Sequence, residues 1–497
     1  MMTTVLVVAA AGLSGCGLVN RPAPQPAENP AAAVEFADML REQVTIDALM
    51  AHLGEFQEIA DAHDGNRALG TQGYAASVDY VANALRDKGF EVQTPEFEVR
   101  LSWSDEPALT VAGETVTARP LDFTIGTEAM GSEGVTGPLV VAPAEDTPGC
   151  TVGDYDGVPV EGAVVLVDRG ACPFAAKQAV AAERGAAAVI VANNQDGDEM
   201  GGTLGRDTEV KVPVISVTKA AGAQLRGQQG APVTITLNAG VRVEKTRNVI
   251  AQTATGSTSD IVMVGAHLDS VAEGPGINDN GSGVAAVLET ALQLGSSPPV
   301  RNAVRFGFWG AEEYGLLGSS DYVESLDPDA LKDIALYLNF DMLGSPNPGY
   351  FTYDGDQSTK IGARQGVPRI REGSAGIERT LVAYLDREGK PAEDTSFDGR
   401  SDYDAFTKSG IPAGGLFSGA GEEKSAQQVE LWGGQADEPF DPNYHKDTDT
   451  LDNIDQTAMQ ILGGGVAYVV GLYAQDQRGR NGIPVREDRT RHQLTES

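Results

Sequence analysis

The sequence predicts an α/β protein with a mixed, largely parallel sheet that is covered by helices on both faces, together with an inserted β-rich domain. Two patterns predict this fold class. From Ile261 onward, apolar strands alternate with helical segments, an order that favours a parallel sheet between two layers of helices. Between about residues 121 and 240, short runs of Val and Ile are instead divided by Gly and Pro. The length of 497 residues also exceeds what one hydrophobic core usually organises.

The expected elements of the α/β part follow one another in a regular order. Residues 75–88 carry apolar side chains at helical spacing and are followed by Gly89, which is suited to a helix C-terminus. After the β-rich segment, we expect a helix after Glu313, a helix at 283–294, and strands at 261–266, 303–309 and 336–340. Ligand-binding groups in such sheets gather beyond the carboxyl ends of the strands. The residues that follow these strands are therefore the candidates for a functional site.

Composition divides the chain into segments of different character. We expect a signal peptide at 1–15, a Pro- and Ala-rich tether at 16–38 and a polar, disordered tail at 476–497. The α/β domain is then split between residues 39–120 and 241–475, and the β-rich domain at 121–240 is inserted into it.

The N-terminal residues have the pattern of an export signal. An apolar run from Val5 to Leu13, too short to span a bilayer, leads into Leu13-Ser14-Gly15-Cys16. This tetrad resembles a bacterial lipobox, which implies cleavage before Cys16 and a lipid on its sulfur. We therefore expect an exported protein, either lipid-anchored at the outer face of the cell membrane or secreted.

Cysteine usage agrees with export. Of the three cysteines, Cys150 and Cys172 remain once Cys16 is set aside, and both fall in the β-rich segment. Two cysteines in an oxidising compartment are expected to form a disulfide, although two separate buried thiols are the alternative.

The charge of the protein argues against some partners. A formal net charge of −35, from 71 acidic and 36 basic side chains, repels nucleic acid and anionic lipid. We therefore expect no nucleic-acid partner, contact with a membrane only through a lipid, and a soluble protein whose acidic groups form a hydrated surface. We also expect a monomer.

Histidines and carboxylates gather in four segments, three of which follow predicted strands. The segments are Gly265-Ala266-His267-Leu268-Asp269-Ser270 with Asn278-Asp279-Asn280-Gly281-Ser282-Gly283, Trp309-Gly310-Ala311-Glu312-Glu313, Asn339-Phe340-Asp341-Met342 and Asn443-Tyr444-His445. Each has an ordinary explanation when taken singly: a hydrogen-bonded core histidine, an Asp in a turn, or carboxylates at a helix N-terminus. Together they supply enough imidazoles and carboxylates for two divalent metals that share a bridging carboxylate.

The residue types favour zinc over other metals. Adjacent carboxylates at a buried strand end are unfavourable unless cations compensate them, and imidazole with carboxylate ligands suits hydrolytic zinc. An all-oxygen set would indicate magnesium or calcium. The acidic loop Asp354-Gly355-Asp356 is a calcium candidate of this kind, with a simple turn as the alternative.

The four segments, in this order and spacing, resemble metallopeptidase family 28, the bacterial leucyl-type aminopeptidases with two zinc ions. The resemblance covers most of residues 40–475 and implies a zinc exopeptidase-like fold. Within the insertion, residues 164–174, Lys177 and residues 185–194 resemble a protease-associated domain, a non-catalytic module that is known within this family. Asp168 and Arg169 are accordingly expected to be structural.

The resemblance implies a role for each residue of the set. His267 and Asp341 would bind one zinc, Glu313 and His445 the other, and Asp279 would bridge both. Glu312 would be the general base, and Tyr444 would donate a hydrogen bond to the developing oxyanion.

Three further residues are candidates near this set. Asp269 and Asp449 follow the histidine ligands by two and four positions and could orient their imidazoles, with a helix cap as the alternative for Asp449. The resemblance places Arg400 near the substrate, and a surface ion pair with Asp398 or Asp402 is an equal alternative.

The predicted function is an exported aminopeptidase that hydrolyses the N-terminal bond of peptides or proteins. A two-zinc carboxypeptidase or dipeptidase on the same fold is the nearest alternative, because the metal site does not decide which substrate end is held. A related cyclase that uses one metal fits the full ligand set less well. A binding or receptor protein without catalysis is the alternative from another class.

Overall fold

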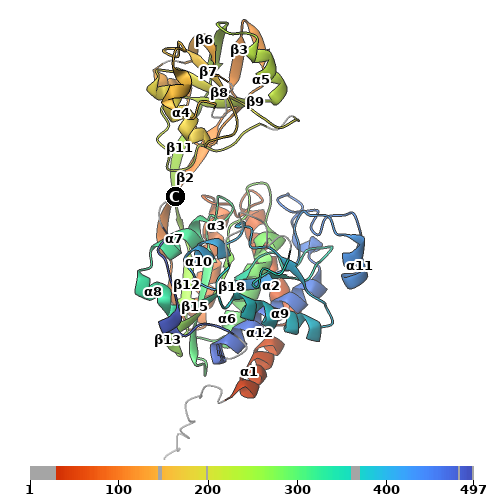
Figure 1. Ribbon diagram of the computed structural model, residues 1–497. Coiled ribbons are helices and arrows are strands. Elements are labelled where there is room, and N and C mark those ends of the chain that lie inside the picture. The colour runs from red at the N-terminus through yellow and green to blue at the C-terminus, as the bar shows by residue number, and fades with distance from the viewer. Residues whose placement is uncertain are drawn as a thin grey trace, which may run out of the picture. The chain divides into compact units, whose positions relative to one another are not determined.

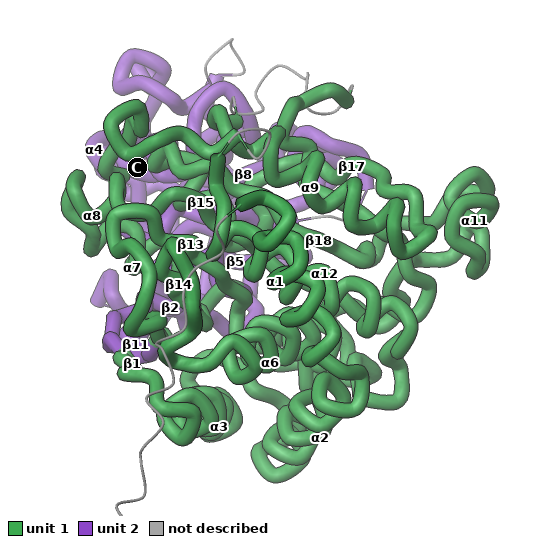
Figure 2. The backbone as a smooth tube through the Cα atoms, turned by 90° about the horizontal axis from the view of Figure 1, so that it is seen from below, with its two compact units in different colours: residues 1–94, 248–312, 318–497 green, residues 95–247, 313–317 purple. Residues whose placement is uncertain are grey.

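The structure is a computed structural model that describes residues 29–131, 133–143, 148–197, 200–359, 370–478 and 482–494. The signal segment and Cys16 lie outside these residues. The chain divides into two compact units (Figure 2). Unit 1 comprises residues 1–94, 248–312 and 318–497, and unit 2 comprises residues 95–247 with the short loop 313–317.

Unit 1 is built on an eight-stranded sheet (Figure 1). Its strand order is β1 (Glu91–Gln93), β12 (Val249–Gln252), β14 (Asn302–Trp309), β13 (Ser257–His267), β15 (Ile334–Phe340), β18 (Ala413–Phe417), β16 (Phe351–Tyr353) and β17 (Glu393–Thr395). The four central strands, β14, β13, β15 and β18, are mutually parallel, whereas β12 and β16 run antiparallel to their central neighbours. The predicted mixed, largely parallel sheet is confirmed.

Helices cover both faces of this sheet because its central strands are apolar on both sides. In β13, Val262 and Val264 point into one core and Met263 into the other, as the two-residue period of a strand requires. The first core includes helices α1 (Pro30–Gln43), α2 (Ile46–Ala62), α3 (Gln72–Asp87), α6 (Gly283–Leu294), α9 (Ser374–Arg387) and α12 (Gln456–Gln475). The second includes α7 (Leu317–Glu324), α8 (Pro328–Asp333) and α10 (Tyr403–Lys408).

Helix α12 is a long, largely apolar helix of unit 1. Among the described residues it alone is long and apolar enough to cross a membrane, but 83% of its apolar window is buried inside the structure. Its side chains belong to the first core of unit 1, against α1 and α6. It is therefore packed as a core helix.

Unit 2 contains its own eight-stranded sheet and a two-stranded ribbon. The sheet order is β4 (Glu114–Val116), β3 (Ala108–Val111), β10 (Pro232–Thr236), β6 (Val135–Val141), β7 (Val164–Asp168), β8 (Ala188–Ala192), β9 (Val214–Val217) and β5 (Arg119–Pro120). Helices α4 (Phe174–Glu183) and α5 (Lys219–Arg226) pack against it, and Cys150 and Cys172 form a disulfide. The ribbon pairs β2 (Glu96–Ser104) with β11 (Ala239–Arg247).

The limits of three segments differ from the expected ones. Unit 2 begins at Pro95, not near residue 121, because the nine residues of β2 pair with β11. Helix α1 begins at Pro30 inside the expected tether, where Asn29 caps it by accepting from the Ala32 N–H. Residues 482–494 of the expected disordered tail lie on unit 1, where the guanidinium groups of Arg489 and Arg491 bind backbone carbonyls.

Two glycines of unit 1 give a matched test of this packing. A methyl group on Gly415 in β18 would overlap the carbonyl oxygen of Asn339, so Gly415→Ala should lower the free energy of unfolding by about 1–3 kcal/mol. Gly54 lies inside α2 with no atom within 4 Å of such a methyl group, so Gly54→Ala should raise it by about 0.5–1 kcal/mol. Urea unfolding of both variants measures the two effects, and a stabilised Gly415→Ala would contradict this packing.

Candidate metal centre and active site

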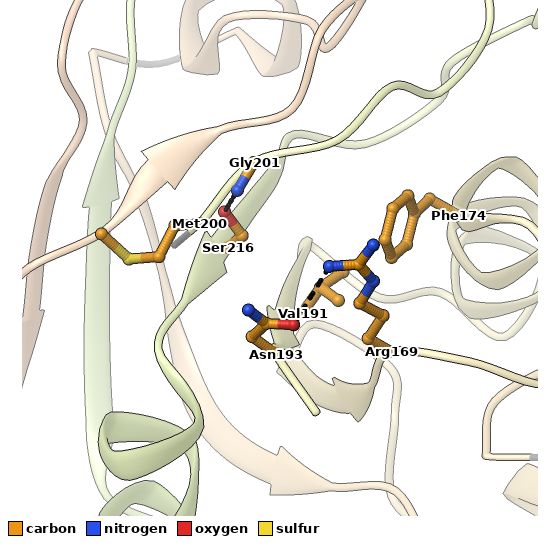
Figure 3. A pocket seen from close by; sticks show the side chains of 7 residues that line it. All are labelled: Arg169, Phe174, Val191, Asn193, Met200, Gly201 and Ser216. Atoms are coloured by element: carbon orange, nitrogen blue, oxygen red, sulfur yellow. Dashed lines mark hydrogen bonds between the residues drawn. The ribbon is translucent and has the colours of Figure 1, made fainter. Parts of the chain in front are cut away.

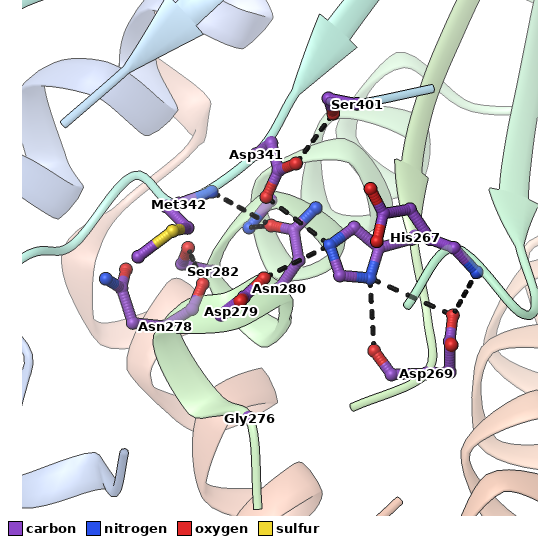
Figure 4. Close-up of polar contacts among 12 residues, drawn as sticks. His267, Asp269, Gly276, Asn278, Asp279, Asn280, Ser282, Asp341, Met342 and Ser401 are labelled. Atoms are coloured by element: carbon purple, nitrogen blue, oxygen red, sulfur yellow. Dashed lines mark hydrogen bonds and ion pairs between the residues drawn. The ribbon is translucent and has the colours of Figure 1, made fainter. Parts of the chain in front are cut away.

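The predicted site residues meet beyond the carboxyl ends of three adjacent strands. His267 is the last residue of β13, Asp341 follows β15, and Glu312 follows β14 by three positions. The parallel register pairs His267 with Trp309 at the end of β14, which brings these strand ends level. Asp279 joins them from the turn Ile277–Ser282 that leads into α6 (Figure 4).

His267 faces two carboxylates with one ring nitrogen. Its Nε2 lies 3.2 Å from Asp279 Oδ1 and 3.4 Å from Asp341 Oδ1, and the side chain is only 1% exposed. Its Nδ1 lies 3.1 Å from the backbone oxygen of Asp269, which requires a proton on Nδ1 and leaves Nε2 free to act as a ligand. Burial alone would lower the pKa of His267, but the carboxylates of Glu312 and Asp341 and hydrogen bonds to Asp279 and Asp341 raise it well above its ordinary value. Nε2 and the two carboxylate oxygens therefore surround a place for a positive charge, which either a proton on Nε2 or a metal ion can supply.

Asp279 is placed to bridge two such cations. Its second oxygen, Oδ2, lies 3.2 Å from Nε2 of His445, so each carboxylate oxygen faces a different histidine. Burial raises the pKa of Asp279, but hydrogen bonds from His267 and His445 outweigh burial and lower it overall. Asp279 is therefore ionised, as a bridging ligand must be.

The remaining ligand atoms fit two divalent ions. Oδ2 of Asp341 accepts a 2.6 Å hydrogen bond from Ser401 Oγ, and its buried Oδ1 has no hydrogen-bond partner among the described residues. Ligand atoms lie within 4.8 Å of one another in two groups that share Asp279, namely His267, Asp279 and Asp341, and Asp279, Glu313 and His445. The structure thus brings all five predicted ligands together, and their nitrogen and oxygen atoms suit zinc.

Glu312 lies beside the ligands and is 8% exposed. It forms a further group with His267 and Glu313 whose ligand atoms are within 4.8 Å of one another. Its backbone N–H donates a 3.1 Å hydrogen bond to Oδ1 of Asp269. Asp269 thereby holds the His267 imidazole through its backbone oxygen and the Glu312 backbone through its carboxylate.

Asp449 has a different role from the expected one. It accepts the backbone N–H groups of Asn278 at 2.8 Å and Asp279 at 3.0 Å, so it holds the backbone of the bridging ligand. This carboxylate is 3% exposed, and burial raises its pKa to about 8 against the effect of the two N–H donors. The sequence suggested His445 as its partner because the two residues are close in the chain.

Tyr444 and Arg400 lie at the more exposed side of the centre. The Tyr444 ring stacks on the His445 ring with centroids 3.8 Å apart. Nη2 of Arg400 lies 3.5 Å from the Tyr444 hydroxyl, and its Nη1 lies 3.6 Å from a carboxylate oxygen of Glu422. The hydrogen bond from Arg400 to Asp398 comes from its backbone N–H, so the guanidinium pairs with Glu422 instead of the expected Asp398 or Asp402.

Two residues that support the centre were not singled out from the sequence. Ser401 donates to Asp341, and the buried Arg67 donates to backbone carbonyls on either side of the loop between His267 and Asp279. Both are common residue types in loops. Neither has a local signal that could have identified it.

The acidic loop at Asp354 forms a second cluster of carboxylates. Oxygens of Asp354, Asp356 and Glu378 lie within 4.8 Å of one another, and Glu378 accepts the Asp356 N–H at 2.9 Å. Burial, together with the neighbouring aspartates, raises the pKa of Glu378 to about 7. Calcium binding there stays a prediction.

Unit 2 has a small pocket that contains none of the predicted ligands. Its lining residues are Arg169, Phe174, Val191, Asn193, Met200, Gly201 and Ser216 (Figure 3). Nη1 of Arg169 donates to Oδ1 of Asn193 at 3.2 Å, and Asp168 forms an ion pair with Arg226. These contacts hold neighbouring elements of unit 2 together, in line with a structural role.

Comparison with known proteins gives three findings. The model of Peptidase family M28 matches residues 248–470, and that of the PA domain matches residues 135–225. The probable lipoprotein aminopeptidase LpqL of Mycobacterium tuberculosis is 67% identical over 94% of this chain and 93% of its own length.

Two solved structures are similar over most of the chain. An aminopeptidase from Aneurinibacillus sp. strain AM-1 has a TM-score of 0.68 at 26% identity, covering 87% of this chain and 95% of its own. A zinc aminopeptidase from Bacillus subtilis has a TM-score of 0.57 at 25% identity, covering 88% of this chain and 98% of its own.

The pKa of Glu378 predicts a pH-dependent change in stability. Because its folded pKa of about 7 is above the ordinary value of 4.5, the charged Glu378 destabilises the fold increasingly as pH rises from 4.5 through 7. Glu378→Gln should therefore melt at a higher temperature than wild type at pH 8 and at a similar one at pH 4, in calcium-free buffer. Thermal melts with exposed Glu372→Gln as control measure this. Added calcium that stabilises wild type but not Glu378→Gln would support a calcium site.

Proposed function

This chain belongs to peptidase family M28 and is a zinc-dependent aminopeptidase with an inserted PA domain, and we propose that it is exported and holds two zinc ions. The observation that carries the two-ion proposal is the Asp279 carboxylate, whose oxygens each lie 3.2 Å from the Nε2 atom of a different histidine. In the proposed site, His267 and Asp341 hold one ion, and Glu313 and His445 hold the other. All residues of the centre come from one chain, so a monomer suffices for activity.

When bound, the two ions would lower the pKa of a water molecule between them and polarise the scissile carbonyl. Glu312 accepts the proton of the attacking water on its carboxylate and then delivers that proton to the leaving amine. Its burial beside the ligands, without a place in either of the two ligand groups that share Asp279, supports this role. Asp269 fixes the position of Glu312 through the backbone N–H.

The substrate is proposed to be held by its free α-amine. Glu312 and the neighbouring ligand carboxylates supply the negative charge that an ammonium group needs. The Tyr444 hydroxyl donates a hydrogen bond to the oxyanion as it forms. Arg400, 3.5 Å from that hydroxyl, contacts the substrate at the same side of the centre.

Export with a lipid anchor is proposed from the N-terminus together with the relative in Mycobacterium tuberculosis, which is described as a probable lipoprotein. The tetrad Leu13-Ser14-Gly15-Cys16 provides the acylated cysteine. The disulfide between Cys150 and Cys172 is compatible with an oxidising compartment.

Replacing the proposed general base tests the mechanism. Glu312→Gln keeps the shape of the side chain but cannot accept the proton, so kcat on leucine p-nitroanilide should fall by about 10²–10⁴-fold. Zinc content, measured by elemental analysis, should stay at two ions per chain in both proteins. Glu289→Gln, a buried carboxylate that contacts His52 elsewhere in unit 1, is the matched control and should keep its activity.

Blocking one end of a peptide substrate tests whether the enzyme recognises the amino or the carboxyl terminus. The wild type should cleave leucyl peptides with an amidated C-terminus and should not cleave N-acetylated ones. Cleavage of N-acetylated peptides that have a free C-terminus would favour a carboxypeptidase, and a zinc-loaded protein inactive on all of these peptides would contradict the proposed function.

Replacement of Cys16 tests the anchor. Cys16→Ala removes the sulfur that would carry the lipid, so the protein should move from the detergent phase to the aqueous phase in Triton X-114 partitioning of expressing cells. Wild type that partitions into the aqueous phase would exclude the lipid anchor.

A further inference from the structure

Arg67 is a fully buried cation beneath the candidate metal centre. It lies in the connection between α2 and α3 and is 0% exposed. Arginine is rarely buried to this extent unless its donors are satisfied. Here Nε donates to the backbone oxygen of Pro275 at 2.9 Å, Nη1 to that of Leu268 at 2.6 Å, and Nη2 to that of Gly276 at 2.7 Å.

The three acceptors belong to the loop 268–276 that connects two predicted zinc ligands. Leu268 directly follows His267, and Gly276 precedes Asp279 by three residues. One planar guanidinium therefore fixes both ends of the loop. The backbone N–H of Arg67 also donates to Oγ of Ser270 at 2.9 Å, inside the same loop.

The loop fits closely around the guanidinium. Gly276 has a φ of +63°, and a methyl group there would lie 3.3 Å from Nη2 of Arg67 and 2.5 Å from Cβ of Ser270. On the other side, the Phe56 ring lies with its centroid 4.9 Å from the guanidinium carbon. These close contacts restrict the loop to one conformation around the Arg67 side chain.

The charge of Arg67 also suits its surroundings. Burial lowers the pKa of Arg67 to about 10, while the nearby carboxylates of Asp269, Asp449 and Asp279 act in the opposite direction. Arg67 is therefore a cation at neutral pH. Its charge lies among the carboxylates that surround the bridging ligand.

We propose that Arg67 is a positioning residue that sets the zinc affinity of the half-site formed by His267, Asp279 and Asp341. It acts through backbone carbonyls: the loop is held ready, so zinc does not have to order it on binding. This inference rests on the proposed two-zinc function. Arg67 contacts neither the substrate nor the reacting atoms.

The chain offers a matched control in Arg489. Its guanidinium side chain is 1% exposed, and its Nη1 donates to the backbone oxygens of Ser259 and Lys332. Ser259 lies near the start of β13, the strand that ends at His267. Arg489→Met thus removes a buried guanidinium from the opposite end of the same strand.

The experiment measures zinc dissociation constants by chelator competition, and kcat and KM at saturating zinc, for wild type, Arg67→Met, Arg67→Lys and Arg489→Met. Arg67→Met should weaken binding of one of the two zinc ions by about 10–100-fold and lower kcat, with KM close to that of wild type. Arg67→Lys keeps the charge, but its ammonium group cannot donate to three carbonyl oxygens in one plane. Its zinc affinity should therefore lie between those of wild type and Arg67→Met. Arg489→Met should bind zinc like wild type, although it melts at a lower temperature.

Equal zinc affinity in Arg67→Met and Arg489→Met would overturn the proposal, because Arg67 would then stabilise only the fold. If Arg67→Met does not fold, Arg67→Lys decides: wild-type zinc affinity overturns the proposal, and a selective loss of one ion supports it. Failure of the proposed function is a separate result, namely a wild type that holds fewer than two zinc ions or cleaves no free-amino substrate. In that case, the zinc dissociation constants of Arg67→Met and Arg489→Met are still compared for whichever zinc ion the wild type binds.

Discussion

Repulsion among buried carboxylates is the constraint on which the rest of the centre depends. Asp279, Asp341, Glu312 and Glu313 meet at the ends of adjacent parallel strands, and Asp269 and Asp449 lie directly behind them. Like charges this close are unstable in a buried place unless cations and hydrogen-bond donors offset them. The protein supplies part of the compensation through two imidazoles, the Arg67 guanidinium, the Ser401 hydroxyl and several backbone N–H groups. Divalent zinc would supply the remainder, which explains why such a costly arrangement can persist.

The sheet makes this arrangement rigid. Its central strands are apolar on both faces, so helices pack on either side and the strand ends have little freedom to move apart. Ligands that project from such strands are held more precisely than ligands on loops. Asp279, Glu313 and His445 lie in turns instead. The turn that carries Asp279 is held by Asp449, which accepts its N–H groups, and by Arg67, which donates to a preceding carbonyl.

The sequence predicted what depends on local pattern. His267, Asp341 and Glu312 could be found because strongly apolar strands ended in unusual polar residues, and the parallel order placed those ends together. Hydrogen bonds from side chains to backbone groups that are distant in the sequence could not be predicted. Asp449 and Arg67 form hydrogen bonds with backbone groups about 170 and 200 positions away in the chain. No pattern of sequence spacing predicts such partners.

The limits of the inserted unit were misjudged for a similar physical reason. Strand β2 has the alternating pattern of an ordinary amphipathic strand. Only its pairing with β11, more than a hundred residues later in the chain, assigns it to unit 2. The C-terminal tail is polar and was expected to be disordered. Its arginines nevertheless bind carbonyls at the start of the central strands, a contact that composition does not reveal.

The pairing of β1 with β12 shows how the insertion is tolerated. Gln93 of β1 pairs with Ile250 of β12, and Glu96 of β2 pairs with Arg247 of β11. The chain thus leaves the catalytic sheet and returns to it at neighbouring positions, as if the tip of a β-hairpin had been extended by a whole domain. An insertion of this kind changes no strand order and adds little loop-closure entropy to the catalytic fold. The sheet of unit 1 therefore keeps its strand order and its central parallel strands although about 150 residues are inserted between β1 and β12.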